Sequence, residues 1–209
     1  MARHPSVTSQ VPAPIRLYGR RVTLRPLIPT DFAEWSEVRR RNEAWLTPWE
    51  PRRPPVQLDP SVNREAFAVR CAGRDRDATA GLAYGFAVFV DHRLSGEVNL
   101  NHVVRGAMQS GTIGYWIDQA RAGRSLIAES VVVVAAFAFE QLDLHRIEIC
   151  IVPRNRNSRR VMEKLAIREE GIAQRFLEIN GVWEDHVRYA MTVEEWEERH
   201  EALLHTWVD

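Results

Sequence analysis

The stretch from residue 114 to residue 142 limits the folds open to this chain more than any other part of the sequence. It begins with Gly-Tyr-Trp-Ile-Asp at 114–118, continues through small, polar and cationic residues, and ends in an apolar run that reaches Leu142. Aromatic and β-branched residues favour a strand at its start. The apolar run contains no Gly or Pro and is too long for an ordinary buried strand, which predicts a buried helix. Val131–Val134 argue against a helix, because β-branching disfavours it, but the length and the helix-forming residues that follow outweigh them.

A strand, a short loop with a glycine and a helix N-terminus together form a candidate anion site. The first N–H groups of a helix have no partner inside it, and the helix dipole places partial positive charge there. Arg121 and Arg124 add full charges on either side of Gly123. A phosphate or pyrophosphate is the expected ligand. The alternative is a plain turn with solvated arginines, and this segment alone favours that alternative.

Composition argues against several classes of function. The 209 residues fit one domain, and a formal net charge of zero gives no charge excess for general binding of nucleic acid or anionic membranes. Cys71 and Cys150 are too few and too isolated for a disulfide framework or a zinc site, so no metal is expected and both are read as small buried residues of a cytoplasmic protein. The longest apolar run, Val131–Phe139, is too short to cross a membrane. Residues 1–14, with three prolines, read as a flexible tail before a single domain at 15–209.

The rest of the sequence predicts strands and helices in one domain. Asn180-Gly181 is the preferred type I′ hairpin dipeptide, and Thr192-x-x-Glu195 is a capping box that opens a C-terminal helix. A segment with five prolines at 45–60 is expected to lack regular structure and to cover a binding site. Strands are expected at 21–26, 84–90, 94–103, up to 117, 145–152, 174–179 and 182–192, and further helices at 31–42, 62–72 and 158–165.

Several short motifs occur in a characteristic order along this pattern. They are Val-Thr-Leu-Arg-Pro (22–26), Gly-Glu-Val-Asn-Leu (96–100), Gly-Tyr-Trp-Ile-Asp (114–118), Ala-Gly-Arg-Ser-Leu (122–126), His-Arg-Ile-Glu-Ile (145–149), Asn155-x-x-Ser158, Glu-Lys-Leu (163–165) and Gly181-x-Trp183-x-Asp185-His186. In their order and spacing they resemble the GNAT N-acetyltransferases, and among these the RimJ/RimL ribosomal-protein N-terminal (alanine) acetyltransferases. The resemblance covers about residues 17–196. It implies an α/β (α+β) fold with a mixed, mostly antiparallel central sheet flanked by helices.

The resemblance also implies that acetyl-CoA is the cosubstrate and that backbone amides of the loop before the central helix hold its pyrophosphate. The residues that match the coenzyme site are Trp116, Ile117, Arg121, Ala122, Gly123, Arg124, Ser125, Leu126, Asn155 and Ser158. The family loop begins with Gln or Arg and ends with Gly or Ala, whereas this chain has Ala120 and Ser125 at those positions. The Ser125 side chain could clash with the phosphate, donate to it or cap the helix. We expect binding to be retained.

The implied reaction is direct transfer of the acetyl group to a primary amine, without a covalent enzyme intermediate. The amine must lose a proton, the oxyanion needs a donor, and the departing thiolate benefits from a proton. Ser158 matches the family's thiolate donor, with a helix N-cap as its alternative role. Asn155 matches a residue that contacts the pantetheine arm or orients its loop, with a turn residue as the alternative.

Glu97 is the candidate base, provided that burial raises its pKa, and a surface glutamate is the alternative reading. Asp118, Asp185 and His186 are rival bases, although a strand histidine is more often packed than catalytic. The oxyanion donor is expected to be a backbone N–H near Ile117.

The acceptor is expected between the 45–60 segment and the 174–192 hairpin, with Glu43, Glu50 or Glu97 beside its amine. Its most favoured identity is a protein N-terminus. A small amine, such as an antibiotic or a polyamine, and a degenerate protein that binds coenzyme A without chemistry remain alternatives, as do a monomer and a homodimer. Finally, Ala166 stands where family members often have Gly; a positive φ there would cost about 1 kcal/mol.

Overall fold

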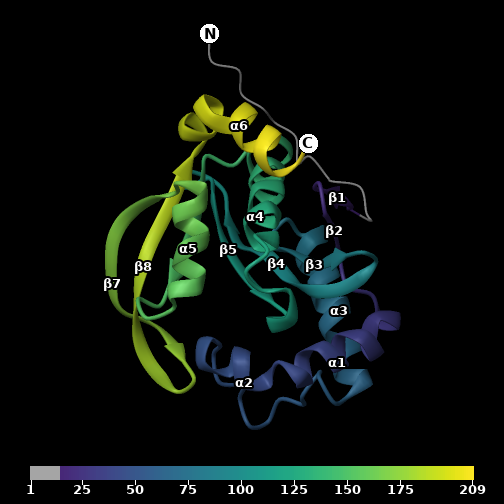
Figure 1. Ribbon diagram of the computed structural model, residues 1–209. Coiled ribbons are helices and arrows are strands. Elements are labelled where there is room, and N and C mark those ends of the chain that lie inside the picture. Colours follow the sequence, from purple (N-terminus) through teal and green to yellow (C-terminus); the bar gives the residue numbers. More distant parts are fainter. Residues whose placement is uncertain (1–14) are drawn as a thin grey trace.

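The computed structural model describes residues 15–209, which form an eight-stranded sheet with helices packed against it (Figure 1). The strands lie in the order β1-β2-β3-β4-β5-β6-β8-β7, and neighbours are antiparallel except β5 and β6, which are parallel. The mixed, mostly antiparallel sheet expected from the sequence is therefore confirmed. The tail predicted at residues 1–14 lies outside the described residues.

The strands are β1 Leu17–Tyr18, β2 Val22–Arg25, β3 Tyr84–Val90, β4 Arg93–Val104, β5 Ser110–Ile117, β6 Arg146–Ile151, β7 Arg168–Ile179 and β8 Val182–Thr192. The α-helices are α1 Phe32–Arg41, α2 Glu43–Leu46, α3 Arg64–Thr79, α4 Leu126–Ala136, α5 Arg156–Leu165 and α6 Val193–Trp207. Short 3₁₀ turns lie at Pro29–Asp31, Thr47–Trp49 and Gln119–Arg121, and a π-helical turn at Phe137–Gln141 follows α4.

Alternation along the strands builds a separate apolar cluster on each face of the sheet. On β3, Phe86 and Val88 belong to the large cluster that contains the buried face of α4, whereas Ala87 and Phe89 belong to a smaller cluster with α1 and α3. Successive side chains of a strand point to opposite faces, so α4 and the α1–α3 layer cover opposite sides of the sheet.

The helix predicted for 126–142 is confirmed as α4 and the π turn after it. The valines of α4 are buried, and the one acidic residue of α4, Glu129, is fully buried as well. The Glu129 carboxylate accepts hydrogen bonds from the Val22 N–H at 3.0 Å and from Arg21 Nε at 2.8 Å. These contacts compensate the buried charge and tie α4 to the start of β2.

The parallel pairing of β5 with β6 extends over only three residue pairs, Ser110 with Arg146, Gly111 with Ile147 and Thr112 with Glu148. Beyond them β5 runs on to Ile117 and β6 to Ile151 without pairing to each other. The two central strands therefore part inside the sheet, and Tyr115–Ile117, which pair with β4 on one edge, have no strand partner on the β6 edge among the described residues.

Several local predictions are confirmed and others are wrong. Asn180 and Gly181 have φ angles of 47° and 86°, as the type I′ turn requires, and the capping box at Thr192 is present. The 45–60 segment is not free of regular structure, because α2 and a 3₁₀ turn reach Trp49. Strand β1 was not predicted because it is very short. The first half of β7 was not predicted because its side chains are mostly exposed and, unlike the equally exposed second half, it does not adjoin the Asn180-Gly181 turn.

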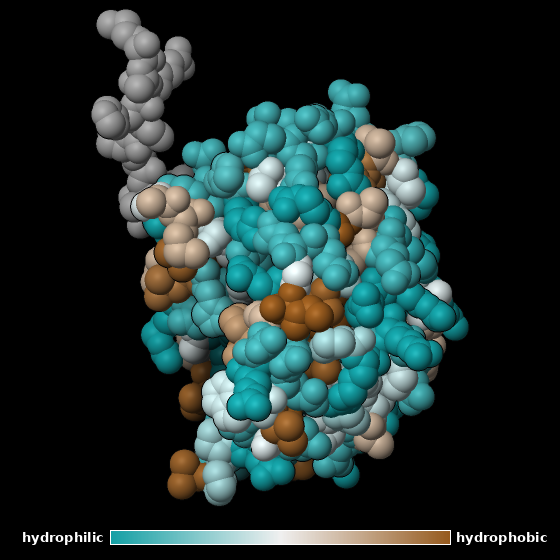
Figure 2. All heavy atoms as spheres, turned by 90° about the vertical axis from the view of Figure 1, so that its left-hand side faces the viewer, coloured by the Kyte–Doolittle hydropathy of each residue, from teal (hydrophilic) through white to brown (hydrophobic). Residues whose placement is uncertain are grey.

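The two cysteines are free; Cys71 is buried, as expected, whereas Cys150 is only partly buried. The side of the molecule turned toward the viewer in Figure 2 is largely hydrophilic, with hydrophobic residues in small groups. Within residues 15–209 no helix combines the length and hydropathy that crossing a membrane requires.

Ala166 follows α5 with φ 47° and ψ 42°, a left-handed conformation that favours Gly. We expect Ala166→Gly to raise the free energy of unfolding by about 1 kcal/mol, measured by urea denaturation. Ala72→Gly, at an exposed position inside α3, is the matched control and should lower it by about 1 kcal/mol. An unchanged or lowered stability of Ala166→Gly would show that this conformation carries no strain.

Candidate functional site

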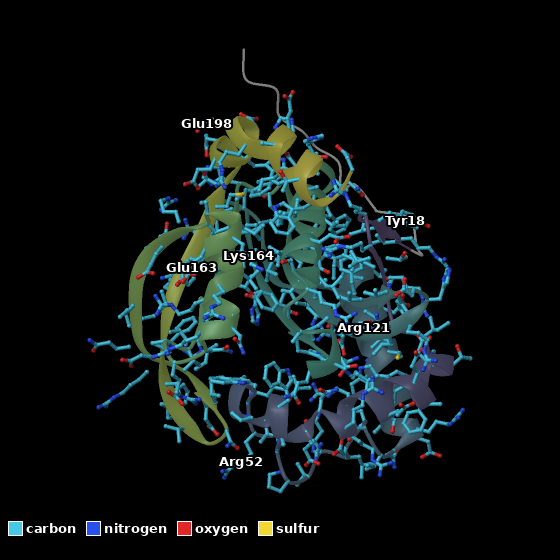
Figure 3. All side chains as sticks on the ribbon, in the orientation of Figure 1. Tyr18, Arg52, Arg121, Glu163, Lys164 and Glu198 are labelled. Carbon is cyan, nitrogen blue, oxygen red and sulfur yellow. The ribbon has the colours of Figure 1, made fainter. Side chains whose placement is uncertain are left out.

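A cavity of about 900 Å³ lies between the end of β5 and α5, the helix that follows β6, and extends to the α1–α3 layer. Its walls come from α1, α2, α3, β4, β5, the segment before α4, the first turn of α4, and α5. Figure 3 labels Arg121 and Lys164, which enter this wall from the segment before α4 and from α5. The cavity thus joins the predicted anion site to the tryptophan-rich segment.

The segment before α4 presents a row of unpaired backbone amides to the cavity. Within residues 15–209, none of the N–H groups of residues 123–128 donates to an acceptor, whereas the Glu129 N–H donates to the Ser125 carbonyl. Residues 121–128 all line the cavity, and Arg160 and Lys164 on α5 face the same space. Free amides at a helix N-terminus with cationic side chains around them form a site that fits a diphosphate.

Ser125 begins α4 in a left-handed conformation with φ 60° and ψ 15°, which is a position for Gly. Its hydroxyl does not cap the helix, so the capping role considered from the sequence is wrong. Instead, Lys164 Nζ donates to Ser125 Oγ at 2.7 Å. The side chain is therefore held toward α5.

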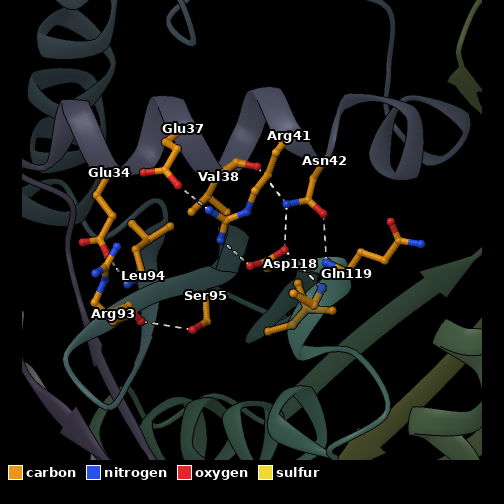
Figure 4. Close-up of polar contacts among 12 residues, drawn as sticks. Glu34, Glu37, Val38, Arg41, Asn42, Arg93, Leu94, Ser95, Asp118 and Gln119 are labelled. Carbon is orange, nitrogen blue, oxygen red and sulfur yellow. Dashed lines mark hydrogen bonds and ion pairs between the residues drawn. The ribbon is translucent and has the colours of Figure 1, made fainter.

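Asp118 fixes the start of this segment against α1 (Figure 4). Its buried carboxylate accepts hydrogen bonds from Arg41 at 2.5 Å, Asn42 Nδ2 at 2.9 Å and the Ala120 N–H at 3.2 Å, and Asn42 Oδ1 accepts from the Gln119 N–H at 2.9 Å. Burial opposes ionisation, but the hydrogen bonds from Arg41 and Asn42 outweigh it and keep the pKa of Asp118 below its usual range. Asp118 does not line the cavity, so its role is structural.

Ser158 and Tyr115 form a hydroxyl pair in the wall of the cavity. The N-cap of α5 is Asn155, whose Oδ1 accepts from the Ser158 N–H at 3.2 Å, so the alternative reading of Ser158 as the cap is wrong. The Ser158 hydroxyl, which does not cap the helix, donates to Tyr115 Oη at 2.9 Å. Burial raises the pKa of Tyr115, which keeps its phenol protonated. Tyr115 was missed as a site residue, although its alternation with Trp116 already placed it on the α5 side.

Glu97 lies on β4 in the α1–α3 half of the cavity and is 2 % exposed, so it is not a surface residue. Its carboxylate accepts from Trp35 Nε1 at 2.7 Å and pairs with Arg70 at 2.6 Å. Burial alone would raise the pKa of Glu97, but the charge of Arg70 and the Trp35 hydrogen bond outweigh it and lower the pKa. The raised pKa expected of a base is therefore wrong for this residue.

The other rival bases lie away from the cavity. Asp185 is exposed and accepts from the Arg175 N–H at 2.8 Å. His186 is buried, with Nδ1 3.0 Å from the Glu184 carbonyl oxygen and its ring against Phe176. The structure thus brings Glu97, Ser158 and the coenzyme-loop residues to one cavity and excludes Asp118, Asp185 and His186 from it.

The α1–α3 half of the cavity is built from tryptophans and arginines. Trp45 Nε1 donates to the Ile117 carbonyl at 3.1 Å, so α2 is fixed to the end of β5. Arg39 pairs with Glu50 at 2.6 Å and lies 5.0 Å from the centre of the Trp116 ring. The 45–60 segment lines the cavity as expected, but the 174–192 hairpin does not; α3 supplies Arg70 and Arg74 in its place. Glu43 also lies outside the lining.

Comparisons with known proteins agree with this geometry. A family model described as the acetyltransferase (GNAT) domain matches residues 21–168. The chain belongs to the GNAT acetyltransferase family. The probable N-acetyltransferase YjcK of Bacillus subtilis (strain 168) is 36 % identical over 172 residues, which are 81 % of this chain and 93 % of YjcK.

Two further relatives are named for ribosomal-protein acetylation or for RimJ. The [ribosomal protein uS5]-alanine N-acetyltransferase of Escherichia coli (strain K12) is 29 % identical over 190 residues, 90 % of this chain and 95 % of that protein. The structure of Mycobacterium smegmatis RimJ in complex with CoA-disulfide superposes with a TM-score of 0.82 and 31 % identity, covering 92 % of this chain and 93 % of that one. This GNAT protein is therefore an acetyl-CoA-dependent N-acetyltransferase related to the ribosomal-protein enzymes. Residues 15–209 contain no cluster of three or more His, Cys, Asp or Glu side chains that could hold a metal ion.

Asn42 is buried and links α1 to the coenzyme segment. Replacing it by Ala leaves the Gln119 N–H and part of the Asp118 carboxylate without partners. We therefore expect Asn42→Ala to lower the free energy of unfolding by about 2–3 kcal/mol. We also expect a several-fold loss of coenzyme A affinity, measured by calorimetry. Asn63→Ala, which removes the cap of α3, is the control; it should cost about 1 kcal/mol and leave that affinity unchanged. Equal affinities of the two variants would contradict the link.

Proposed function

We propose that this enzyme transfers the acetyl group of acetyl-CoA to the α-amine at the N-terminus of a protein, with a ribosomal protein as the favoured acceptor. The observation that carries the proposal is the continuity of the cavity from the free amides of residues 123–128, past the Tyr115–Ser158 pair, to Glu97 and the tryptophans. Such a channel provides a diphosphate site, a proton donor and an acceptor site in that order.

At the coenzyme end, the free amides fit the pyrophosphate, and Arg121, Arg124, Arg160 and Lys164 add positive charge. Trp116, Ile117 and Asn155 line the path toward Ser158 and are proposed to contact the pantetheine arm. Acetyl-CoA would supply the activated acyl group as a thioester. Positioning of the two reactants in one channel converts a bimolecular encounter into an oriented reaction.

Ser158 is the proposed proton donor to the departing thiolate. Its hydroxyl is not used as a helix cap, because Asn155 caps α5, and its hydrogen-bond partner is Tyr115. Tyr115 is protonated and 2.9 Å away, so it can return a proton to Ser158 Oγ after transfer. An N–H group near Ile117 remains the proposed oxyanion donor.

Glu97 is proposed to position Trp35 and Arg70 rather than to abstract the amine proton. Both of its oxygens are already engaged, and its lowered pKa makes it a weak base. The acceptor ammonium would then lose one proton to water and react as the free amine. The second proton, which the nitrogen loses as the amide forms, would pass through water to Tyr115 and so replace the proton delivered to the thiolate by Ser158.

The acceptor half favours a protein N-terminus over a polycationic small amine. Three arginines, at positions 39, 70 and 74, face two glutamates, Glu50 and Glu97, so a polyamine or an aminoglycoside would meet net positive charge. The likeness to the E. coli ribosomal protein uS5-alanine enzyme supports the same choice.

Incubation of the protein with acetyl-CoA and peptides that begin with Ala or Ser is expected to add one acetyl group to the peptide N-terminus, measured by mass spectrometry. The same peptides with a blocked N-terminus are the control and should gain none. Acetylation of polyamines or aminoglycosides but of no peptide would refute the proposed acceptor. Coenzyme A binding in a thermal-shift assay without any turnover would identify a degenerate protein.

The pH profile of kcat/KM tests the role given to Glu97. Because the pKa of Glu97 in the folded protein lies below its usual range, this carboxylate is ionised at every pH above about 5.5, which is already more than one unit above the pKa of an unperturbed glutamate. We therefore expect kcat/KM to rise until the peptide α-amine is deprotonated, near pH of about 8, and to level off there. Peptides whose α-amines differ in pKa should shift the profile accordingly. An inflection of kcat/KM at the same pH for every peptide would instead indicate a base on the protein.

A further inference from the structure

The floor of the acceptor half contains a shallow depression with one polar side chain in it. Gly85 on β3 pairs with Asn99 on β4, and Asn99 pairs with Gly114 on β5, so the three residues form a row across the sheet. In the adjacent row, Ala87 pairs with Glu97 and Glu97 pairs with Trp116. Alternate residues of a strand share a face, so both rows face α3, and the missing side chains of the two glycines make room there for Arg74 and Asn101.

Arg74 of α3 lies over this depression. A Cβ atom added to Gly85 would stand 3.4 Å from Arg74 Cδ and from one of its guanidinium nitrogens, so Gly85 gives Arg74 the room to lie against the sheet. Arg74 donates to Asn101 Oδ1 at 3.1 Å. Both Arg74 and Asn101 line the cavity.

Arg74 differs from the two other arginines in this half of the cavity because it has no acidic partner. Arg39 pairs with Glu50 and Arg70 pairs with Glu97, but within residues 15–209 no carboxylate lies within salt-bridge distance of Arg74. Burial and the neighbouring charge of Arg70 lower the pKa of Arg74, although the group stays charged. The charges of Glu97 and Asp77 act on Arg74 only from beyond ion-pair distance, so this largely buried cation has no direct anionic partner in the described part of the chain, and a bound anion would supply one.

Asn99 provides an independent sign that this place accepts a ligand. Its Oδ1 is buried and has no hydrogen-bond partner among the described residues. The same atom would lie 3.1 Å from a Cβ on Gly85, which places it beside Arg74. Buried polar atoms are nearly always paired in folded proteins, so an unpaired oxygen beside Arg74, in a side chain that lines the cavity, indicates a missing N–H donor.

We propose that Arg74 and Asn99 form an acceptor subsite in which the guanidinium binds a carboxylate of the acceptor and Asn99 Oδ1 accepts an N–H of the same molecule. The substrate class is an amine that carries a carboxylate close to it. A protein N-terminus with an acidic residue directly after the first position has this chemistry, and so does a free amino acid. The inference rests on the proposed acetyl transfer and narrows its acceptor.

The test compares two peptides that differ in one group, Ala-Asp and Ala-Asn at the N-terminus of the same sequence. The wild-type ratio of kcat/KM, acidic over neutral, should be about tenfold or more, as a charge-assisted hydrogen bond provides. Arg74→Gln should bring this ratio close to one. Because both peptides are measured on one preparation, partial misfolding of a variant cancels from the ratio.

Arg76→Gln is the matched control, since it removes the same charge from an exposed position two residues along α3. Arg76→Gln should leave the kcat/KM ratio of the two peptides at its wild-type value. This result would show that Arg74 acts by direct contact with the peptide and not through the overall positive charge of α3. A wild-type ratio near one, or equal loss of the ratio in both variants, would overturn the subsite.

A second pair, glycine and glycinamide, distinguishes the two sources of the carboxylate. Acetylation of glycine that depends on Arg74, with no preference between the peptides, would retain the subsite and replace the peptide by a free amino acid. If nothing is acetylated, the proposed transfer fails, and binding then decides the subsite. In the coenzyme A-bound wild type, the fluorescence of the cavity tryptophans should be quenched more by the acidic peptide than by the neutral one, or more by glycine than by glycinamide. This difference should vanish in Arg74→Gln. Equal quenching by both members of each pair, or no quenching, would overturn the subsite.

Discussion

Three residue pairs hold β5 to β6, and the separation of these strands beyond Thr112 and Glu148 creates the space on which the rest of the molecule depends. A sheet with complete pairing would bury Tyr115–Ile117 against a neighbour and leave no passage between its two faces. Because the pairing stops, Tyr115 reaches Ser158 on one side while Trp116 and Glu97 face α3 on the other. The coenzyme segment and the acceptor layer therefore meet through the sheet rather than around its edge.

The two layers are also joined at their ends by a small number of buried polar contacts. Asp118 and Asn42 link the start of the coenzyme segment to the end of α1, and Trp45 links α2 to the last residue of β5. Glu97 likewise links two helices, because its carboxylate accepts hydrogen bonds from Trp35 of α1 and Arg70 of α3. The carboxylates of Asp118 and Glu97 are both hydrogen-bonded to cationic and neutral donors. These contacts lower their pKa despite burial, so the two groups stabilise the structure and are poor bases.

The sequence predicted the fold where the pattern was local and repeated. The apolar run of α4, the Asn180-Gly181 turn and the capping box at Thr192 each carry their own signal, and all three are confirmed. Both halves of β7 have mostly exposed side chains and little alternation, and only the second half, which adjoins the Asn180-Gly181 turn, could be predicted.

The site was predictable in part for the same reason. The coenzyme segment lies in one stretch of chain, so its residues could be named together. The environment of Glu97 depends on Trp35 and Arg70, which are distant in sequence, and no local pattern reports that an arginine will cancel the effect of burial. Tyr115 and Arg74 were missed likewise, because their partners, Ser158 and the Gly85–Asn99 row, become neighbours only in the folded sheet.

Lys164, which holds the Ser125 hydroxyl, is the only lysine in the chain. The molecule therefore carries a single side-chain amine, and it stands at the mouth of the coenzyme segment on an exposed part of α5. Reagents that acylate or alkylate lysine would mark this protein at one side chain, and a ligand seated against the segment would shield it. Because the other basic side chains of this length are arginines, the rate at which this one lysine is modified would report whether the coenzyme segment is occupied.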